Sequence, residues 1–260
     1  METALLEVKN LIREERSDGI LTLSFNSTNT HNPFSKEMRD AVIASLQKAK
    51  GDTSLRAVIL TGGEGRSFCV GGDFNETITF TTPEQVENWI DSVVLLYLSC
   101  LELDVPTIAA VDKYAIGIGF QLALTCDWRI GTEQCSFIMP ELKNGIACTL
   151  GSFMLSHLLG KAQMQKIVFG CQEIPAAEAY HMNLLHEITT SENLLARAAE
   201  EAKRLSNFPE IPWSGSKKMI NRSFINGLNE ILIESKLVHV DSFMSQSGVK
   251  FFKKILNKDF

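Results

Sequence analysis

The sequence contains no block of basic residues. Its 25 Lys and Arg are outnumbered by 31 Asp and Glu, which gives a formal net charge of −6. Nucleic-acid binding depends on clustered positive charge that neutralises phosphates, so we expect no nucleic-acid partner. A phosphate-rich ligand would have to be held locally, by backbone N–H groups and a few Lys or Arg side chains.

Long hydrophobic runs are also missing. The longest, from Val93 to Cys100, is far shorter than the roughly 20 residues that a membrane-spanning helix needs. The first residues, METALLEVKNLIREERS, carry charges throughout and show no cationic stretch followed by an apolar core. We therefore expect no signal peptide, no membrane association and a cytoplasmic location.

Cysteines are present but form no recognisable metal or disulfide pattern. No CxxC pair and no His-rich spacing accompanies them, so we expect reduced thiols in the core and no metal site. The six are Cys69, Cys100, Cys126, Cys135, Cys148 and Cys171.

What is present is an alternation of strand and helix patterns. A half-buried strand is predicted for residues 19–25, and a helix capped by Ser35 has apolar residues at helical spacing. Continuous apolar runs at 57–60 and 107–111 indicate strands covered on both faces. Thr82-Pro83-Glu84-Gln85 has the form of a capping box and opens a helix to about Leu103. The same alternation continues through Phe137–Leu142 and Gly151–Leu159.

From about Ser191 onward the pattern is helical only. Leu194, Ala198 and Ala202 share one helix face, and later Leu237, Val240 and Phe243 share another. The prediction is an α/β chain of stacked strand–helix units over residues 1–190, followed by a C-terminal helical region over 191–260. Composition alone does not separate this arrangement from a doubly wound sheet.

Two glycine turns each lie between a buried strand and a helix. They are Ser67-Phe68-Cys69-Val70-Gly71-Gly72-Asp73-Phe74 and Ala115-Ile116-Gly117-Ile118-Gly119-Phe120-Gln121. Glycine allows close backbone approach, and a helix N-terminus offers unpaired N–H groups. Two such turns facing each other would supply paired donors for a developing oxyanion. The alternative is a pair of tight strand-to-helix turns without chemistry.

Taken together, the motifs resemble the crotonase (enoyl-CoA hydratase/isomerase) superfamily over roughly residues 5 to 257. The likeness is carried by the order and spacing of His31-Asn32-Pro33-Phe34-Ser35, SFCVGGDFNE, VPTIAAVDKYAIGIGFQLALTCDWRI, and FIMPELKNGI followed by Gly151.

That resemblance implies a spiral of stacked ββα units, and C-terminal helices that assemble a homotrimer or a dimer of trimers. It also implies an oxyanion hole for an acyl-CoA carbonyl, made by the backbone N–H groups of Gly72 and Ile118. No cofactor is expected to be bound permanently, because the coenzyme A thioester is the substrate.

One departure from the family pattern narrows the chemistry. Hydratases of this family carry two glutamates, whereas here the first of those positions is Gln121 and only Glu141 remains. An amide has no titratable proton in the working range, so Gln121 can orient a substrate or water but cannot act as acid or base. A simple hydratase is therefore disfavoured.

Within the superfamily, the motifs are most similar to the carboxymethylproline synthases, which form a carbon–carbon bond. Those enzymes decarboxylate malonyl-CoA to an enolate, add it to pyrroline-5-carboxylate, a cyclic imino acid, and hydrolyse the new thioester. The resemblance implies that Glu141 activates the hydrolytic water. It further implies that the ligand is bound by Val70, Gly71, Gly72, Asp73, Phe74, Trp89, Gln121 and His239.

Several of the residues that could act in the site also have a purely structural interpretation. Glu141 follows Pro140 and could simply begin a helix, and Trp89 could belong to the core. His239 could be a satisfied helix histidine, or its imidazolium could pair with the carboxylate of the imino acid. The run Phe251-Phe252-Lys253-Lys254 is either a contact for the coenzyme A phosphates or a solvated helix end.

Other functions stay open at this point. A single-glutamate crotonase could be a double-bond isomerase, an acyl-CoA hydrolase or a β-branching decarboxylase acting on a carrier-protein thioester. A degenerate member that binds acyl-CoA without turnover is the alternative from another functional class.

Overall fold

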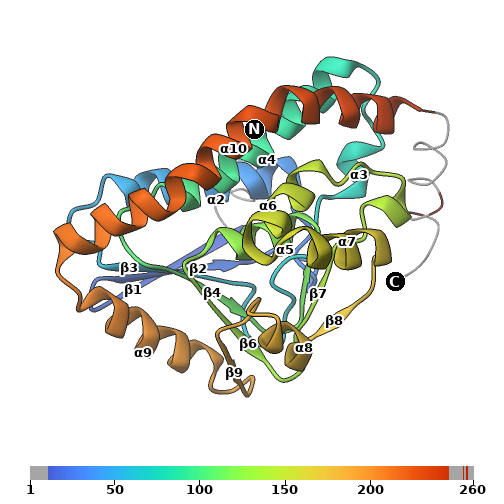
Figure 1. The fold of residues 1–260 in the computed structure, drawn as a ribbon. Coiled ribbons are helices and arrows are strands. Elements are labelled where there is room, and N and C mark those ends of the chain that lie inside the picture. Colours follow the sequence, from blue (N-terminus) through green and yellow to red (C-terminus); the bar gives the residue numbers. More distant parts are fainter. Residues whose placement is uncertain (1–10, 246–253, 255, 257–260) are drawn as a thin grey trace.

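The computed structural model describes residues 11–245, together with residues 254 and 256 (Figure 1). Its strands are β1 (Ile12–Ser17), β2 (Ile20–Phe25), β3 (Ala57–Thr61), β4 (Thr107–Val111), β5 (Tyr114–Ile116), β6 (Trp128–Thr132), β7 (Ser136–Ile138), β8 (Ile174–Pro175) and β9 (Glu187–Thr189). Its helices are α2 (Lys36–Lys50), α3 (Phe74–Thr77), α4 (Pro83–Leu101), α5 (Ile118–Thr125), η1 (Leu142–Asn144), α6 (Thr149–Leu159), α7 (Lys161–Gly170), α8 (Ala176–His181), α9 (Leu194–Ser206) and α10 (Glu210–Met244).

A six-stranded sheet with the order β1-β2-β3-β4-β6-β9 forms the base of the molecule. Only β1 and β2 are antiparallel, joined by a tight turn in which Asp18 and Gly19 both have positive φ. The pairs from β2 to β9 are all parallel. Each parallel step requires the chain to cross over, and the crossover segments carry the helices and glycine turns above the sheet.

The central strands are apolar on both faces. Ile59 and Ile108 belong to one buried cluster, on the face covered by Leu194, Ala198 and Ala202 of α9. Leu60 and Ala109, one residue further along the same strands, belong to the larger cluster on the opposite face. Figure 1 shows α9 below the sheet and α2, α4 and α10 above it. This two-sided burial explains why β3 and β4 read as continuous apolar runs.

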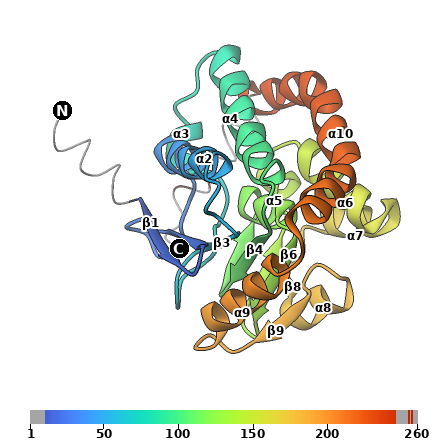
Figure 2. The ribbon, with the colours of Figure 1, turned by 90° about the vertical axis from the view of Figure 1, so that its left-hand side faces the viewer.

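A second, smaller layer lies beside the first sheet. Strands β5, β7 and β8 pair in that order, and isolated bridges extend the layer from Ala115 to Cys69 and from Gly72 to Phe34. Both glycine turns leave this layer at the same end. Figure 2 shows α4 and α10 side by side above it, with α5 and α6 beneath them.

The predicted α/β class with helices at the C-terminal end is confirmed. The helix after the capping box ends at Leu101 rather than Leu103, and its cap makes both predicted hydrogen bonds. Leu237 was wrongly assigned to the buried face with Phe243: it is 60% exposed, whereas Phe243 is buried. The sequence predictions did not include β1, β5, β6, β8, β9, α7 or α8. The division at residues 190 and 191 stays a prediction, with α9 packed on the sheet of the preceding segment.

No helix in the described part of the chain combines the length and apolar character needed to cross a bilayer.

The approach of α5 to the first glycine turn yields a stability prediction. A Cβ at Gly119 would lie 2.2 Å from the carbonyl oxygen of Cys69, which is backbone and cannot move aside. We expect Gly119→Ala to lower the free energy of unfolding by about 3 kcal/mol. Gly215→Ala, in the exposed part of α10 where an added Cβ meets nothing within 4 Å, is the control and should raise it by about 0.4–1 kcal/mol. Urea unfolding curves measure both, and equal effects of the two substitutions would contradict the packing argument.

Candidate active site

Backbone pairing brings the two glycine turns into register. The segments around Cys69 and Ala115 run parallel, with the Ile116 N–H donating to the Cys69 carbonyl at 2.8 Å and the Cys69 N–H donating to the Tyr114 carbonyl at 3.2 Å. Gly72, which is bridged to Phe34, and Ile118 each follow the paired positions by three residues and lie near each other. The side chain of Ile118 confirms the proximity: its Cδ1 lies 3.4 Å from where a Cβ of Gly72 would be.

The N–H groups of Gly72 and Ile118 are available as donors. Among the described residues, no hydrogen bond uses either N–H. Ile118 is the first residue of α5, where the helix itself offers no acceptor, and it follows Gly117, whose φ is 52°. A side chain at Gly117 would be strained by this φ and would also lie 3.3 Å from Glu141 Oε1. The turns therefore hold two neighbouring backbone donors that have no acceptor among the described residues.

A buried ion pair fixes the other side of the first turn. Phe34 donates its N–H to the Gly71 carbonyl at 2.8 Å and accepts from the Asp73 N–H at 3.3 Å. Arg39, 1% exposed, donates to the Phe34 carbonyl at 2.9 Å and binds both carboxylate oxygens of Glu76 at 2.6 and 2.7 Å. This bidentate geometry ties α2 to α3, so Gly72 is held between two anchored segments.

Glu141 is the carboxylate beside these donors. It follows Pro140 and precedes the short helix η1, where its carbonyl accepts from the N–H groups of Asn144 and Ile146. Its Oε1 accepts a hydrogen bond from Gln121 Nε2 at 2.8 Å. Its Oε2 is buried and has no partner among the described residues. One oxygen is therefore oriented, and the other is left to accept a proton.

Burial sets the protonation of Glu141. It raises the pKa of this carboxyl from the usual 4.5 to about 7, against the opposing effect of its own backbone N–H and of the Gln121 amide. A carboxyl with a pKa near neutrality is suited to general-base work at physiological pH.

Trp89 and His239 lie on the far side of the first turn. Trp89 Cζ2 is 3.1 Å from the position of a Cβ on Gly72, and its buried Nε1 has no hydrogen-bond partner in the described part of the chain. The ring centroids of Trp89 and His239 are 6.5 Å apart. The structure thus places Trp89, Gly72 and Ile118 in one group, with His239 behind the indole.

The environment of His239 favours the neutral imidazole. Burial lowers its pKa from 6.5, although the carbonyls of Ser235 and Ala147 act in the opposite direction. Nδ1 lies 2.7 Å from the Ser235 carbonyl, which assigns the proton to this nitrogen. The lowered pKa works against the charged pairing with a carboxylate, which stays one of the two interpretations of His239.

The remaining predicted ligand contacts flank the first turn. Val70 is half-buried, Asp73 caps α3 by accepting from the Asn75 N–H at 2.8 Å, and Phe74 packs against the main core. Phe251, Phe252 and Lys253 lie outside the described residues. The structure therefore does not test whether this run contacts the coenzyme A phosphates or is a solvated helix end. Within the described residues, no group of three or more His, Cys, Asp or Glu side chains could hold a metal ion.

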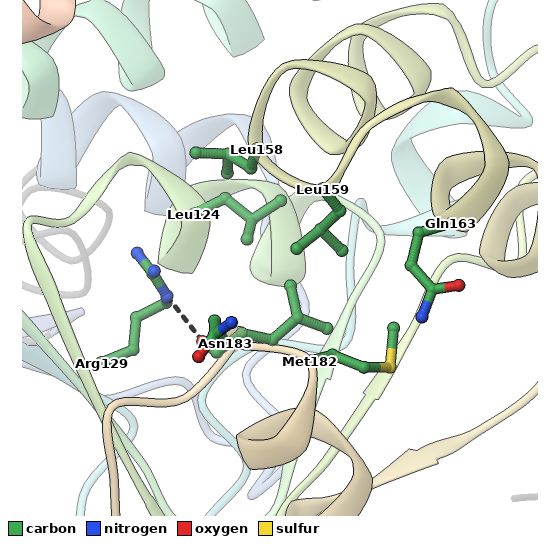
Figure 3. Close-up of a pocket in the computed structure, with 8 residues that line it drawn as sticks. Leu124, Arg129, Leu158, Leu159, Gln163, Met182 and Asn183 are labelled. Atoms are coloured by element: carbon green, nitrogen blue, oxygen red, sulfur yellow. Dashed lines mark hydrogen bonds between the residues drawn. The ribbon is translucent and has the colours of Figure 1, made fainter.

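A pocket of about 280 Å³ lies elsewhere, between the ends of α5 and α6 and the segment before β9 (Figure 3). None of the predicted site residues lines it. Arg129 at its wall donates from Nε to the Leu184 carbonyl at 2.6 Å and from a terminal nitrogen to the Cys126 carbonyl at 2.8 Å. These bonds tie β6 to its neighbours, which gives Arg129 a structural role.

Two residues important to the site were not found from the sequence. Arg39 resembles any surface arginine of an amphipathic helix, and its half-buried partner Glu76 lies 37 residues away. Tyr97 donates to Gln121 Oε1 at 2.9 Å. Its signal was present, because Trp89, Val93 and Tyr97 follow each other at four-residue spacing on one face of α4.

Comparisons with known proteins agree with this geometry. The family model described as enoyl-CoA hydratase/isomerase matches residues 15–260. The carboxymethylproline synthase of Pectobacterium carotovorum subsp. carotovorum is 38% identical over 250 residues, covering 96% of this chain and 100% of that protein. The solved structure of ThnE from S. clavuligerus is 35% identical with a TM-score of 0.76, covering 88% of this chain and 100% of that one. An enoyl-CoA hydratase from Bacillus halodurans, at 20% identity and a TM-score of 0.87 over 94% of this chain and 99% of its own, shares the fold.

The raised pKa of Glu141 yields a prediction about stability. The folded protein holds this proton more tightly than the unfolded chain between pH 4.5 and about 7, so stability falls as the pH rises through that window. Glu141→Gln removes the buried charge and should raise the free energy of unfolding at pH 8 by roughly 1–3 kcal/mol, with the gain vanishing near pH 4. Urea unfolding across this pH range measures the difference. Glu133→Gln, at an exposed position, is the control, and a Glu141→Gln effect independent of pH would contradict the assignment.

Proposed function

Because this chain belongs to the enoyl-CoA hydratase/isomerase family, the crotonase superfamily whose motifs it carries, we propose that it acts as a carboxymethylproline synthase. Family membership also confirms the predicted crotonase fold. The proposed substrates are malonyl-CoA and pyrroline-5-carboxylate, and the proposed products are carboxymethylproline, CO2 and coenzyme A. No resident cofactor takes part, since the coenzyme A thioester is consumed.

The observation that carries this proposal is the combination of two unpaired N–H groups with one carboxylate. Gly72 lies near Ile118, and Glu141 Oε1 lies next to Gly117 and accepts a hydrogen bond from Gln121. A hydratase with two carboxylates would hold a second acid where Gln121 lies. The similarity to the carboxymethylproline synthase, which spans that protein's full length, agrees with this arrangement.

In the first proposed step, the bond between the malonyl carboxylate carbon and the α-carbon breaks. CO2 leaves, and the electron pair forms an enolate whose negative charge rests on the thioester oxygen. The N–H groups of Gly72 and Ile118 stabilise that oxygen; removal of one such donor typically costs about 2.7–4 kcal/mol of barrier. This step needs no general base, so Gln121 in place of a glutamate does not impede it.

In the second step, the enolate α-carbon attacks the imine carbon of pyrroline-5-carboxylate, and the ring nitrogen takes up a proton. The thioester carbonyl re-forms in the oxyanion site. We propose that Trp89 and His239 shape the space for the imino acid, with Val70, Gly71, Asp73 and Phe74 lining the thioester side. Two features support this role: the position of Trp89 against Gly72 and the proximity of His239 to the indole.

In the third step, water attacks the thioester carbonyl while Glu141 takes its proton. The C–S bond breaks, coenzyme A leaves as the thiol, and the free carboxylate is released. The oriented Oε1 and the unpartnered Oε2 of Glu141 support this role. Since the base must be ionised, hydrolysis should increase with pH through about 7.

We further propose a homotrimer or a dimer of trimers. Apolar side chains on α10 remain exposed in the single chain, and burying them against another copy would remove them from water. Ile211, Ile220, Ile233 and Leu237 are 84%, 72%, 75% and 60% exposed.

The central test supplies malonyl-CoA and pyrroline-5-carboxylate and follows CO2, free coenzyme A and the amino acid product. We expect all three from the parent protein. Glu141→Gln should still release CO2, while free coenzyme A falls by roughly 10²–10⁴-fold and the coupled thioester accumulates. Glu133→Gln is the matched control.

Other results would redirect the assignment. If the parent releases no CO2 but isomerises or hydrolyses enoyl or acyl thioesters, another single-glutamate crotonase is correct. If no thioester reacts, the non-catalytic alternative holds.

The oxyanion role of Ile118 can be tested through its backbone. Proline is tolerated at the first position of a helix and lacks the backbone N–H, so Ile118→Pro, which replaces the isoleucine side chain as well, should slow CO2 release by roughly 10²–10³-fold. Ile118→Ala also removes the side chain but keeps the donor, and should stay within about tenfold of the parent. Equal rates for the two variants would exclude the Ile118 N–H as an oxyanion donor.

A further inference from the structure

The Gln121 amide occupies the middle of a buried chain of hydrogen bonds. Tyr97, fully buried on α4, donates its hydroxyl to Gln121 Oε1 at 2.9 Å, and Gln121 Nε2 donates to Glu141 Oε1 at 2.8 Å. Neither the tyrosine nor its bond to the amide belongs to the motifs that define the site. The chain therefore links the carboxylate to a side chain 24 residues before Gln121.

We propose that Tyr97 is a positioning residue: its hydroxyl holds the Gln121 amide in the orientation that donates a hydrogen bond to Glu141. The inference rests on the proposed function, because it assigns Tyr97 to the step in which Glu141 acts as base. It adds a residue that the motifs do not identify.

The chemistry of an amide explains why this orientation needs a partner. One end of the amide donates and the other accepts, and the two ends have nearly the same shape. An ionised carboxylate only accepts, so it selects the NH₂ end, and the oxygen at the other end then requires a donor. Tyr97 supplies that donor in a place where Gln121 is 5% exposed, so that water cannot easily take its place.

The reverse orientation would work against catalysis. With Oε1 turned toward Glu141, the amide could pair only with a protonated carboxyl, which donates its O–H. That arrangement would stabilise the acid form, and the acid form cannot take a proton from water. In that orientation the Tyr97 hydroxyl could accept from Nε2, but its own buried O–H would have no acceptor among the described residues. Tyr97 therefore favours the orientation that pairs with the ionised base, without touching the substrate.

The surroundings of the amide limit other arrangements. Met139 Sδ lies 3.5 Å from Gln121 Nε2, and a Cβ on Gly151 would lie 3.2 Å from the same nitrogen. Gln121 is thus enclosed by Met139, which follows β7, and by α6 and α4, and the hydroxyl on α4 is the donor to its oxygen in the described hydrogen-bond network.

A purely structural tyrosine would give a different result on substitution. Phenylalanine fills nearly the same volume, so packing alone predicts an unchanged pH dependence. The positioning role predicts a specific loss in the base-dependent step, while decarboxylation, which needs no base, continues.

The test compares Tyr97→Phe with Tyr180→Phe, which removes the same atom at a position 47% exposed. In Tyr97→Phe, the acidic limb of thioester hydrolysis should move to higher pH by roughly one unit, and hydrolysis near pH 6 should fall by roughly tenfold. CO2 release should stay within about twofold of the parent in the same samples, which also shows that the variant is folded. Tyr180→Phe should match the parent throughout, and an unshifted profile for Tyr97→Phe would overturn the proposal.

A double substitution tests whether Tyr97 acts through Gln121. Gln121→Met removes the amide at similar volume, so adding Tyr97→Phe to it should produce no further shift of the pH profile. A further shift of the same size as in the parent background would show that Tyr97 acts by another route and would overturn the proposal.

The inference and the proposed function can fail separately. If the parent releases no CO2, the proposed function fails, yet the titration of Glu141 can still be read by carbon-13 NMR of its carboxyl. The titration of Glu141 in Tyr97→Phe should lie at higher pH than in the parent. Identical titrations of Glu141 in the parent and in Tyr97→Phe would contradict the inference, whatever reaction the protein catalyses.

Discussion

The site depends on a short stretch of backbone pairing between the segments around Cys69 and Ala115. Two hydrogen bonds set these segments parallel, and Gly72 and Ile118, three residues beyond the paired positions, lie near each other. The two proposed oxyanion donors are backbone N–H groups, so their positions depend on the path of the backbone and not on a side-chain rotamer. The close approach of Gly119 to Cys69 and the anchoring of Phe34 by Arg39 both serve this register.

The pKa of Glu141, the carboxylate next to these donors, is set by opposing effects. Burial raises the pKa of Glu141, and hydrogen bonds from Gln121 and from its own backbone N–H restrain that rise. The resulting pKa of about 7 suits the general-base role proposed for Glu141. It also means that ionisation of this buried carboxyl lowers the stability of the folded protein. Gln121 contributes orientation without a second titrating proton, which distinguishes this site from one built on paired glutamates.

The helices around the site couple its parts. Helix α4 carries both Trp89, against the first glycine turn, and Tyr97, against Gln121, at helical spacing. Helix α10 packs along α4 and brings His239 next to the indole, with its ring neutral and its Nδ1 bonded to Ser235. The walls of the site are therefore rigid elements, as expected where reacting groups must be held in a defined geometry.

Local sequence patterns were enough to predict much of the secondary structure. Apolar runs predicted β3 and β4, and the capping box predicted the start of α4. These signals are local because propensity and capping act over a few residues. The proposed site residues came from the resemblance of the ordered motifs to a known family, not from any single local pattern. Tertiary structure alone decided the Arg39–Glu76 pair, the Tyr97–Gln121–Glu141 chain and the burial of His239 against the Ser235 carbonyl. Each of these depends on burial and on contacts between segments far apart in the chain, and no local pattern encodes such contacts.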